Sequence, residues 1–445
     1  MPYSCESGAR LSEPLEQRSG GGPTWTDRDA VLAKTAKHVN RGLARLASLM
    51  QVHLEVSSEG ARVFDEAGTA YLDCGGYAVF FHGHRHPKIV AAVRHQLDTH
   101  PLATRAMLSP TLALAAEALA RVAPPGLEYV LFTNSGAEAV EAALKLACAH
   151  GKTVRVSTTG GFHGKTTGAL SVTGRPAFRE PFQPLLAETC FVPFGDAAAL
   201  EQALAAAKGR ACLILEPIQA EAGVILPPAG YLRAARNLCD RYGAMFIADE
   251  IQTGCGRTGH WWALDREGVI PDILLGGKAL GGGVIPVAAL VANAAVFEPF
   301  NRDPLLHTST FAGNPLASAA ALAAIQVIED DGLVVRARDL GAALLDRLTT
   351  ILLETCPDHV RAVRGAGLLI GIEFDSERTA GTFIVELLRR RVVTCHSLNA
   401  HRVVRLTPPA ILSRDECDWL YGAAEEAARS LRRRSPSPTP PDSPS

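Results

Sequence analysis

The stretch PDILLGGKALGGGVIP, residues 271–286, holds the lysine on which the interpretation of the whole chain depends. Its apolar start, residues 273–275, is typical of a short buried strand, and the glycines that follow leave Lys278 in a confined, mostly apolar loop. Because burial disfavours a charged ammonium group, such a lysine tends to become a nucleophilic amine, as Schiff-base lysines are. A lysine beside glycines is more often a solvated loop charge, so this interpretation needs support from the surrounding sequence.

Composition limits the class of protein. The chain has 445 residues, enough for two or three domains, and its formal net charge of −2 provides no field that would attract nucleic acid or an acidic membrane. A small-molecule partner is favoured. The 10 cysteines are scattered without close pairs or zinc spacing, which is typical of reduced thiols. With neither a leader-like N-terminus nor an apolar run near the ~18 residues of a membrane span, we expect a soluble, cytoplasmic protein.

The order of elements predicts an α/β fold. From residue 77 to about residue 311, short β-rich runs alternate with helical patterns, which indicates a mainly parallel sheet flanked by helices. Most of the predicted strands are near-continuous apolar runs, as in sheets covered on both faces. They are residues 129–132, 153–157, 212–215, 245–248, 273–275 and 287–291. Two long helical stretches, strands at 368–374 and 403–406, and a helix over about 415–431 then predict a smaller α+β domain.

Five segments are expected along the chain. Residues 1–24 are polar and glycine-punctuated and are expected to be disordered. Residues 25–76 should form a helix from Thr26 to about Leu49, then strands joined by the turn at 65–68, and belong to the small domain. A large ligand-binding domain over 77–320, a C-terminal small domain over 321–431 and a disordered Ser/Pro-rich tail over 432–445 complete the chain.

In a doubly wound sheet, ligands gather at the carboxyl ends of the strands. The run at 245–248 leads into Asp249, whose carboxylate can pair with a protonated ring nitrogen, as a pyridoxal cofactor requires. Ile251 shares the face of Asp249 if the extended conformation persists, and can pack against a flat ring. Alone, an aspartate at this position is more often a helix cap or an ion-pair partner.

The run at 129–132 leads into Ser135 and a predicted helix. The first-turn amides of this helix and the Ser135 hydroxyl form a natural phosphate site, although an ordinary helix cap explains them equally well. Phe162, in GGFHGKTT, can stack on a planar ring, but an isolated phenylalanine is usually a core residue.

Three further motifs do not support the sites they suggest. GGFHGKT at 160–166 lacks the first glycine of a P-loop, because Thr159 stands at that position. GCGRTG at 254–259 fits GxGxxG, but His-Trp-Trp follows it in place of an apolar helix. The alternating histidines of residues 82–86 are interleaved with Gly83 and precede a proline, which indicates a turn before a helix and no metal site.

Four features follow one another along the chain in the order that a pyridoxal phosphate enzyme uses. They are a helix start suited to phosphate, an aromatic residue, an aspartate at a strand end and a buried lysine. The stretches EPIQAEAGVILPPAGYL, ADEIQTGCGRTG, GGKALGGGVIP and HTSTFAGNPLA resemble the class-III pyridoxal phosphate aminotransferases of fold type I. The resemblance runs essentially from Leu54 to Leu431. Within the family, LDCGGYAVFFHGHRHPKIV and FTNSGAEAVEAALKLA are most similar to putrescine aminotransferases, with ornithine and acetylornithine aminotransferases as relatives.

The resemblance implies a role for each matching residue around pyridoxal 5'-phosphate (PLP). Lys278 would be the catalytic Schiff-base lysine and proton shuttle, and Asp249 would pair with the pyridine nitrogen. The other implied cofactor-binding residues are Phe162 and Ile251 on the two ring faces, Ser135, Gly136 and Ala137 at the phosphate, Gln219 near the ring hydroxyl, His163 and Gln252, and Thr310 from the second subunit of a homodimer.

The resemblance also implies how two substrates share one site. Arg405 matches the arginine that binds the α-carboxylate of 2-oxoglutarate or glutamate, and Glu221 matches a gate glutamate that neutralises it when a substrate without that carboxylate is bound. Tyr77, with Phe80 and Phe81, suggests an aromatic entrance. No metal is expected.

The function expected from these residues is an ω-aminotransferase that moves the terminal amino group of a putrescine-like amine to 2-oxoglutarate. An ornithine or acetylornithine type, a biosynthetic enzyme that makes an amine from an aldehyde, a PLP racemase, aminomutase or decarboxylase, and a non-catalytic binding protein remain open. Ala220 and Ala312 stand where the family commonly has glycine, and Gly277 where it has alanine. These departures leave the substrate open but remove no catalytic group.

Overall fold

The computed structural model describes residues 27–434. The expected disorder of residues 1–24, and of residues 435–445 within the predicted tail 432–445, lies outside the described residues, as does the predicted helix start at Thr26. For residues 432–434 the expected disorder is wrong, because they continue a helix. The described chain forms two compact units, one of residues 27–57 and 63–70 and the other of residues 58–62 and 71–434. Assignment of residues 25–76 to a small domain stays a prediction.

The first unit begins with helical residues, but these do not form the single helix expected up to Leu49. They divide into α1 (Arg28–Lys34), the π-helical turn η1 (Thr35–Val39) and α2 (Arg41–Leu49). The break lies at Asn40, whose backbone is extended and whose side chain accepts a hydrogen bond from Leu43 N at 2.9 Å, capping α2. The predicted turn at 65–68 is confirmed, because Asp65 Oδ1 accepts hydrogen bonds from Ala67 N and Thr69 N. Strands β1 (Ser57–Glu59), β2 (Arg62–Phe64) and β3 (Ala70–Asp73) follow the helices.

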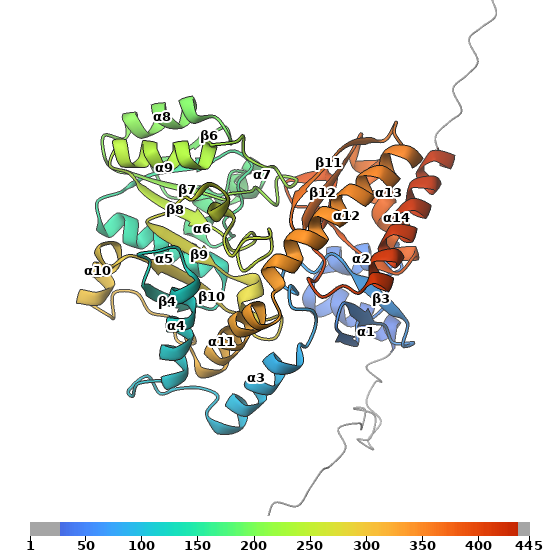
Figure 1. Ribbon diagram of the computed structural model, residues 1–445, viewed down its shortest axis with the longest axis horizontal. Helices are drawn as coiled ribbons and strands as arrows, with labels where there is room; N and C mark the ends of the chain where they lie inside the picture. The colour runs from blue at the N-terminus through green and yellow to red at the C-terminus, as the bar shows by residue number, and fades with distance from the viewer. Residues whose placement is uncertain (1–26, 435–445) are drawn as a thin grey trace, which may run out of the picture. The chain divides into compact units, whose positions relative to one another are not determined.

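A seven-stranded sheet in the order β4-β10-β9-β8-β7-β5-β6 forms the centre of the second unit (Figure 1). The six predicted strands are present within a residue or two, and β6, at an edge, was not predicted. Strands β5 to β9 pair in parallel, whereas β10 is antiparallel to both β4 and β9. The mainly parallel sheet is therefore confirmed. The strands are β4 (Tyr129–Thr133), β5 (Val154–Thr158), β6 (Thr189–Val192), β7 (Ala211–Leu215), β8 (Met245–Asp249), β9 (Ile273–Gly276) and β10 (Ala288–Ala292).

Both faces of this sheet are covered, as the continuous apolar runs indicated. Alternate residues of β7 to β10 pack with α5 (Gly136–Ala149) and α10 (Ala294–Arg302) in one buried cluster. The residues between them are buried too, so the strands lie between two layers. The other helical segments before residue 320 are α3 (Pro87–Thr99), α4 (Pro110–Val122), α6 (Thr167–Val172), α7 (Pro176–Arg179), η2 (Glu180–Phe182), α8 (Ala197–Ala206), α9 (Tyr231–Arg241), η3 (Ala263–Glu267) and η4 (Lys278–Gly281).

A second sheet of order β11-β12-β15-β14 lies in the C-terminal part and is antiparallel throughout. Helices α12, α13 and α14 contact it or one another, as the orange and red ribbons of Figure 1 show. Helix α11 runs across the expected domain boundary at residue 320, and α14 continues three residues beyond its predicted end. The elements are α11 (Pro315–Asp330), α12 (Leu333–Thr355), β11 (Val360–Ala366), β12 (Leu369–Phe374), α13 (Glu377–Arg389), β13 (Val392–Val393), β14 (Cys395–Ser397), β15 (Ala400–Leu406) and α14 (Arg414–Arg434).

The histidines of residues 82–86 lie where the predicted turn places them. His86 is the N-cap of α3, and Pro87 begins that helix. His84 Nε2 donates to Asp73 Oδ2 at 2.9 Å, and His82 Nε2 donates to the Ala324 carbonyl at 3.1 Å. Each of these two histidines therefore has a structural partner. No helix among residues 27–434 is both long enough and apolar enough to cross a membrane.

Candidate active site

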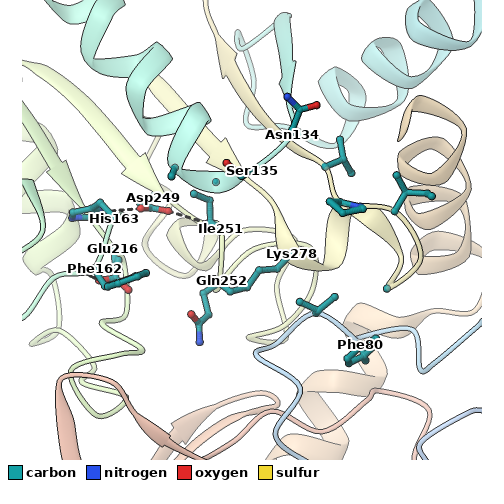
Figure 2. Close-up of a pocket in the computed structure, with 18 of the residues that line it drawn as sticks. Phe80, Asn134, Ser135, Phe162, His163, Glu216, Asp249, Ile251, Gln252 and Lys278 are labelled. Carbon is teal, nitrogen blue, oxygen red and sulfur yellow. Dashed lines mark hydrogen bonds and ion pairs between the residues drawn. The ribbon is translucent and has the colours of Figure 1, made fainter. Parts of the chain in front are cut away.

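A cavity of about 450 Å³ lies at the carboxyl ends of β8 and β9, and Lys278 lines it (Figure 2). Lys278 lies two residues beyond the end of β9 and has a φ of +48°, in the left-handed region that side chains rarely adopt. Strain of this kind costs on the order of 1–3 kcal/mol and is concentrated at functional sites. Burial lowers the pKa of the Lys278 amine, although Glu221 and Asp249 oppose the shift. The amine of Lys278 is therefore confined and loses its proton more readily than an exposed lysine does.

Asp249 ends β8 and faces the same cavity. Its Oδ2 accepts a hydrogen bond from His163 Nδ1 at 2.7 Å, and its Oδ1 accepts one from Ile251 N at 3.2 Å, as the dashed lines of Figure 2 show. His163 is buried, and its Nε2 has no partner among the described residues. These contacts fix the orientation of the Asp249 carboxylate. Together they leave a buried, oriented anion at the cavity wall, suited to a cationic ring nitrogen.

The start of α5 forms another wall of the cavity. Ser135 is the N-cap residue, and its Oγ accepts a hydrogen bond from Glu138 N at 3.3 Å. Gly136 lies close to Ile251, because an added Cβ would be 2.8 Å from Ile251 Cδ1 and the isoleucine side chain would have to shift. Ala137 also lines the cavity. Since the first amides of a helix favour an anion, this wall can bind a phosphate group.

Aromatic and apolar side chains complete the lining. Phe162 and Ile251 both line the cavity, and so does Gln252, whose amide nitrogen has no partner among the described residues. Phe80 lines it too and stacks on His84 with ring centroids 3.8 Å apart.

Of the two phenylalanines expected at an aromatic entrance, Phe80 lines the cavity and Phe81 does not. Phe81 is fully buried, and the Arg257 guanidinium lies 5.0 Å from its ring centroid. Because the backbone turns between the two residues, neighbouring phenylalanines point to different environments.

Glu216 is a lining residue to which the sequence interpretation gave no role. It follows the last residue of β7 and is buried, with Oε1 accepting from Phe162 N at 2.8 Å and Oε2 from Ala220 N at 3.3 Å. Burial, with the nearby Asp249 carboxylate, raises the pKa of its carboxyl well above the usual range. The strand-end rule used for Asp249 would have selected Glu216 as well.

Glu221 and Arg405 form a buried ion pair. Arg405 Nη1 lies 2.5 Å from Glu221 Oε1, and the Arg405 residue is only 1% exposed. Glu221 Oε2 accepts a further hydrogen bond from Leu398 N at 2.9 Å. Burial alone would lower the pKa of the Arg405 guanidinium, but the Glu221 carboxylate raises it above the ordinary value. The guanidinium therefore stays charged.

Among residues 27–434, several of the residues predicted to belong to the site do not line this cavity. Gln219 donates through Nε2 to Thr158 Oγ1 at 2.9 Å and to the Thr159 carbonyl at 3.0 Å. Tyr77 is 62% exposed, and Thr310 is exposed beside a different cavity. The Glu221–Arg405 pair also lies outside the lining, although both side chains act electrostatically on Lys278.

Comparison with known proteins identifies the family. The sequence model of Aminotransferase class-III matches residues 47–427. The chain belongs to the class-III aminotransferase family. Among solved structures, an ornithine aminotransferase from Toxoplasma gondii is 31% identical, with 92% of this chain and 96% of that chain covered and a TM-score of 0.85. An (S)-enantioselective omega-transaminase from Thermomicrobium roseum is 27% identical, with 92% and 99% covered and a TM-score of 0.83. A transaminase from the marine bacterium Virgibacillus is 25% identical, with 91% and 99% covered and a TM-score of 0.84.

This class-III aminotransferase has the fold type I architecture and uses PLP. The residues present fit that cofactor, since the cavity combines an anion site at α5, the oriented Asp249 carboxylate and the amine of Lys278. Two buried polar atoms on its wall, His163 Nε2 and Gln252 Nε2, have no partner among the described residues. When bound, PLP supplies an electron-withdrawing ring that stabilises negative charge at the carbon from which a proton is removed.

Proposed function

We propose that the chain is an ω-aminotransferase that moves the terminal amino group of a putrescine-like diamine or related amine to 2-oxoglutarate, giving an aminoaldehyde and glutamate. The observation that carries this proposal is the buried Glu221–Arg405 ion pair. Transamination binds two substrates in turn at one site, and only the oxo acid brings an α-carboxylate. A carboxylate that pairs with the arginine, and moves away when the oxo acid binds, suits both substrates.

The energetics support this use of Glu221. A guanidinium left without a counter-charge at 1% exposure would be unstable by several kcal/mol, so the amine-bound site needs Glu221 in place. When an oxo acid arrives, its carboxylate replaces that of Glu221. The two carboxylates are chemically equivalent for Arg405, so exchange between them costs little.

We assign the other roles as follows. Lys278 would attach the cofactor, and its amine, made available by the lowered pKa, would carry the proton that leaves the substrate carbon. Asp249, oriented by His163, holds the ring nitrogen in its protonated form. Phe162 and Ile251 would pack on the ring, and Ser135, Gly136 and Ala137 would hold the phosphate.

An ornithine-type activity is the second candidate. The 31% identity to the Toxoplasma gondii ornithine aminotransferase over 92% of this chain favours it. Both activities act on a terminal amine and both suit the Glu221–Arg405 pair. They differ in the far end of the donor, which carries a carboxylate in ornithine and an amine in putrescine.

We also propose a homodimer in which Thr310 reaches the active site of the partner. Its support is a group of exposed apolar residues that line the same cavity as Thr310, namely Met107, Leu108 and Phe311, which are 84%, 100% and 58% exposed. Surfaces of this kind on one protein usually mark an interface. The expected cytoplasmic location stays a prediction.

A donor panel tests the proposal. Purified holoenzyme is incubated with 2-oxoglutarate and putrescine, cadaverine, ornithine or acetylornithine, with the donor's terminal nitrogen labelled, and glutamate is analysed by mass spectrometry. We expect labelled glutamate, formed fastest from putrescine or cadaverine. Faster transfer from ornithine would select the second candidate, and absence of label with every donor would contradict terminal-amine transfer.

A further inference from the structure

A thiol lies against the arginine of the Glu221–Arg405 pair. Cys395, on β14, is the direct cross-strand partner of Arg405, on β15. Arg405 Nη2 donates to Cys395 Sγ at 3.5 Å, and the thiol donates in turn to the Gly75 carbonyl at 3.4 Å. The thiol thus accepts and donates at once, which requires its neutral form. Burial raises the pKa of the Cys395 thiol above its usual value, so this form persists at neutral pH.

Among the described residues, Glu221 and Cys395 are the side chains that hold the Arg405 guanidinium, and Arg405 Nε has no partner. The two contacts differ in permanence. Glu221 lies on a loop and has to leave when an oxo acid binds, whereas Cys395 is fixed by the β14–β15 pairing. Once Glu221 has moved, Cys395 is the remaining side-chain contact that restricts the guanidinium.

The backbone around Cys395 is closely packed, which fixes the thiol in turn. A Cβ added to Gly75 would lie 2.7 Å from Thr394 Cα, so the chain at residue 75 can pack this closely only because it has no side chain. The Gly75 carbonyl is therefore a fixed acceptor for the thiol. This arrangement links the guanidinium to the segment that continues to Val79 and Phe80 in the cavity wall.

The geometry points to Cys395 as a positioning residue for Arg405, one that holds the guanidinium in its carboxylate-binding orientation during the oxo-acid half of the reaction. The inference rests on the proposed function, because it requires Arg405 to bind the oxo-acid carboxylate. The amine half-reaction has Glu221 on Arg405 and does not depend on the thiol. Loss of the thiol should therefore affect one substrate and leave the other unchanged.

The test uses the holoenzyme and the variants Cys395→Ala and Cys395→Ser. For Cys395→Ala we expect the KM for 2-oxoglutarate to rise about three- to tenfold, the effect of one hydrogen bond, while the KM for the amine stays within about twofold. Serine keeps both a donor and an acceptor and should restore most of the affinity. Cys190→Ala removes a partly buried thiol from edge strand β6 and should change neither constant.

A binding measurement separates the inference from the proposed function. Glutarate, a dicarboxylate without the oxo group, is titrated into each holoenzyme by calorimetry, together with Arg405→Met. We expect wild type to bind glutarate, Arg405→Met to lose binding and Cys395→Ala to bind about three- to tenfold more weakly. Binding lost in Arg405→Met but unchanged in Cys395→Ala would overturn this inference alone. Equal binding by wild type and Arg405→Met, or none by either, would overturn both the role of Arg405 and this inference.

Discussion

Removal of the Glu221 carboxylate is the change that separates the two half-reactions most clearly. Glu221→Ala removes the 2.5 Å ion pair of Arg405, whose residue is 1% exposed, and leaves the guanidinium with only the weaker side-chain contact to Cys395. The substitution also leaves Leu398 N without its acceptor. Breaking a buried pair from one side costs about 3–5 kcal/mol, and water admitted to the vacated space reduces this. We therefore expect a penalty of about 3 kcal/mol for the unpaired guanidinium, which corresponds to a factor of roughly 100 in affinity.

The penalty applies to the complex with an amine, which brings no carboxylate for Arg405. In the Glu221→Ala variant, an oxo acid still supplies a carboxylate to Arg405 and no longer has to displace the carboxylate of Glu221. We therefore expect the KM of the amine half-reaction to rise about 100-fold, while the KM for 2-oxoglutarate falls or stays unchanged. Each half-reaction is followed separately, from the absorbance of the cofactor after mixing with a single substrate.

Two controls accompany this measurement. Glu221→Gln keeps an acceptor for Leu398 N but loses the charge, so it should show a smaller shift in the same direction. Glu373→Gln breaks ion pairs with Arg364 and Arg402 in the same sheet, outside the cavity lining, and should leave both half-reactions unchanged. If Glu221→Ala weakened both substrates equally, or neither, the gate argument would be refuted.

Three further changes test other parts of the structure. Asp249→Asn should lower kcat by a factor of about 10² to 10³ without changing the structure, because a neutral amide cannot hold a protonated ring nitrogen. Steady-state rates and cofactor content, measured together, check this. Phe80→Ala should raise kcat/KM for bulky amines relative to putrescine on the order of tenfold, since Phe80 fills one wall of the cavity, and unchanged ratios across a donor series would contradict this role. Glu250 is fully buried, and burial raises the pKa of its carboxyl from 4.5 to about 7. The folded state then keeps a proton that the unfolded state loses, so this group's contribution to stability falls by about 3 kcal/mol as pH rises from about 4.5 to 7. Urea titrations should show Glu250→Gln more stable than wild type by about 3 kcal/mol above pH 7 and equal to it near pH 4.5; a constant difference would contradict the shift.

Most of the large sheet could be predicted because its strands are buried on both faces and appear as apolar runs. Strand β6 escaped prediction because it lies at an edge, where three of its four residues are only partly buried. The antiparallel direction of β10 could not be predicted either, since a buried run has the same composition in both directions. The break at Asn40 was hidden because an asparagine with apolar neighbours at helical spacing is compatible with a continuous helix.

The candidate site was predictable where one residue's chemistry follows from its local sequence. The glycines around Lys278 and the strand before Asp249 are such signals. Glu216 has the same strand-end signal as Asp249, but its contact with Phe162 joins residues 54 apart in the chain and could not be predicted from either local sequence. The Cys395–Arg405 contact depends on the register of β14 and β15, which no spacing in the sequence defines.

Every other assigned role depends on Lys278 as the residue that attaches the cofactor. The most direct measurement is borohydride reduction of the purified holoenzyme, followed by proteolysis and mass spectrometry of the lysine-containing peptides. We expect the added mass of reduced PLP on Lys278 and no such mass at position 278 in the Lys278→Arg variant. Attachment to a different lysine, or no attachment in protein shown to contain PLP, would contradict it.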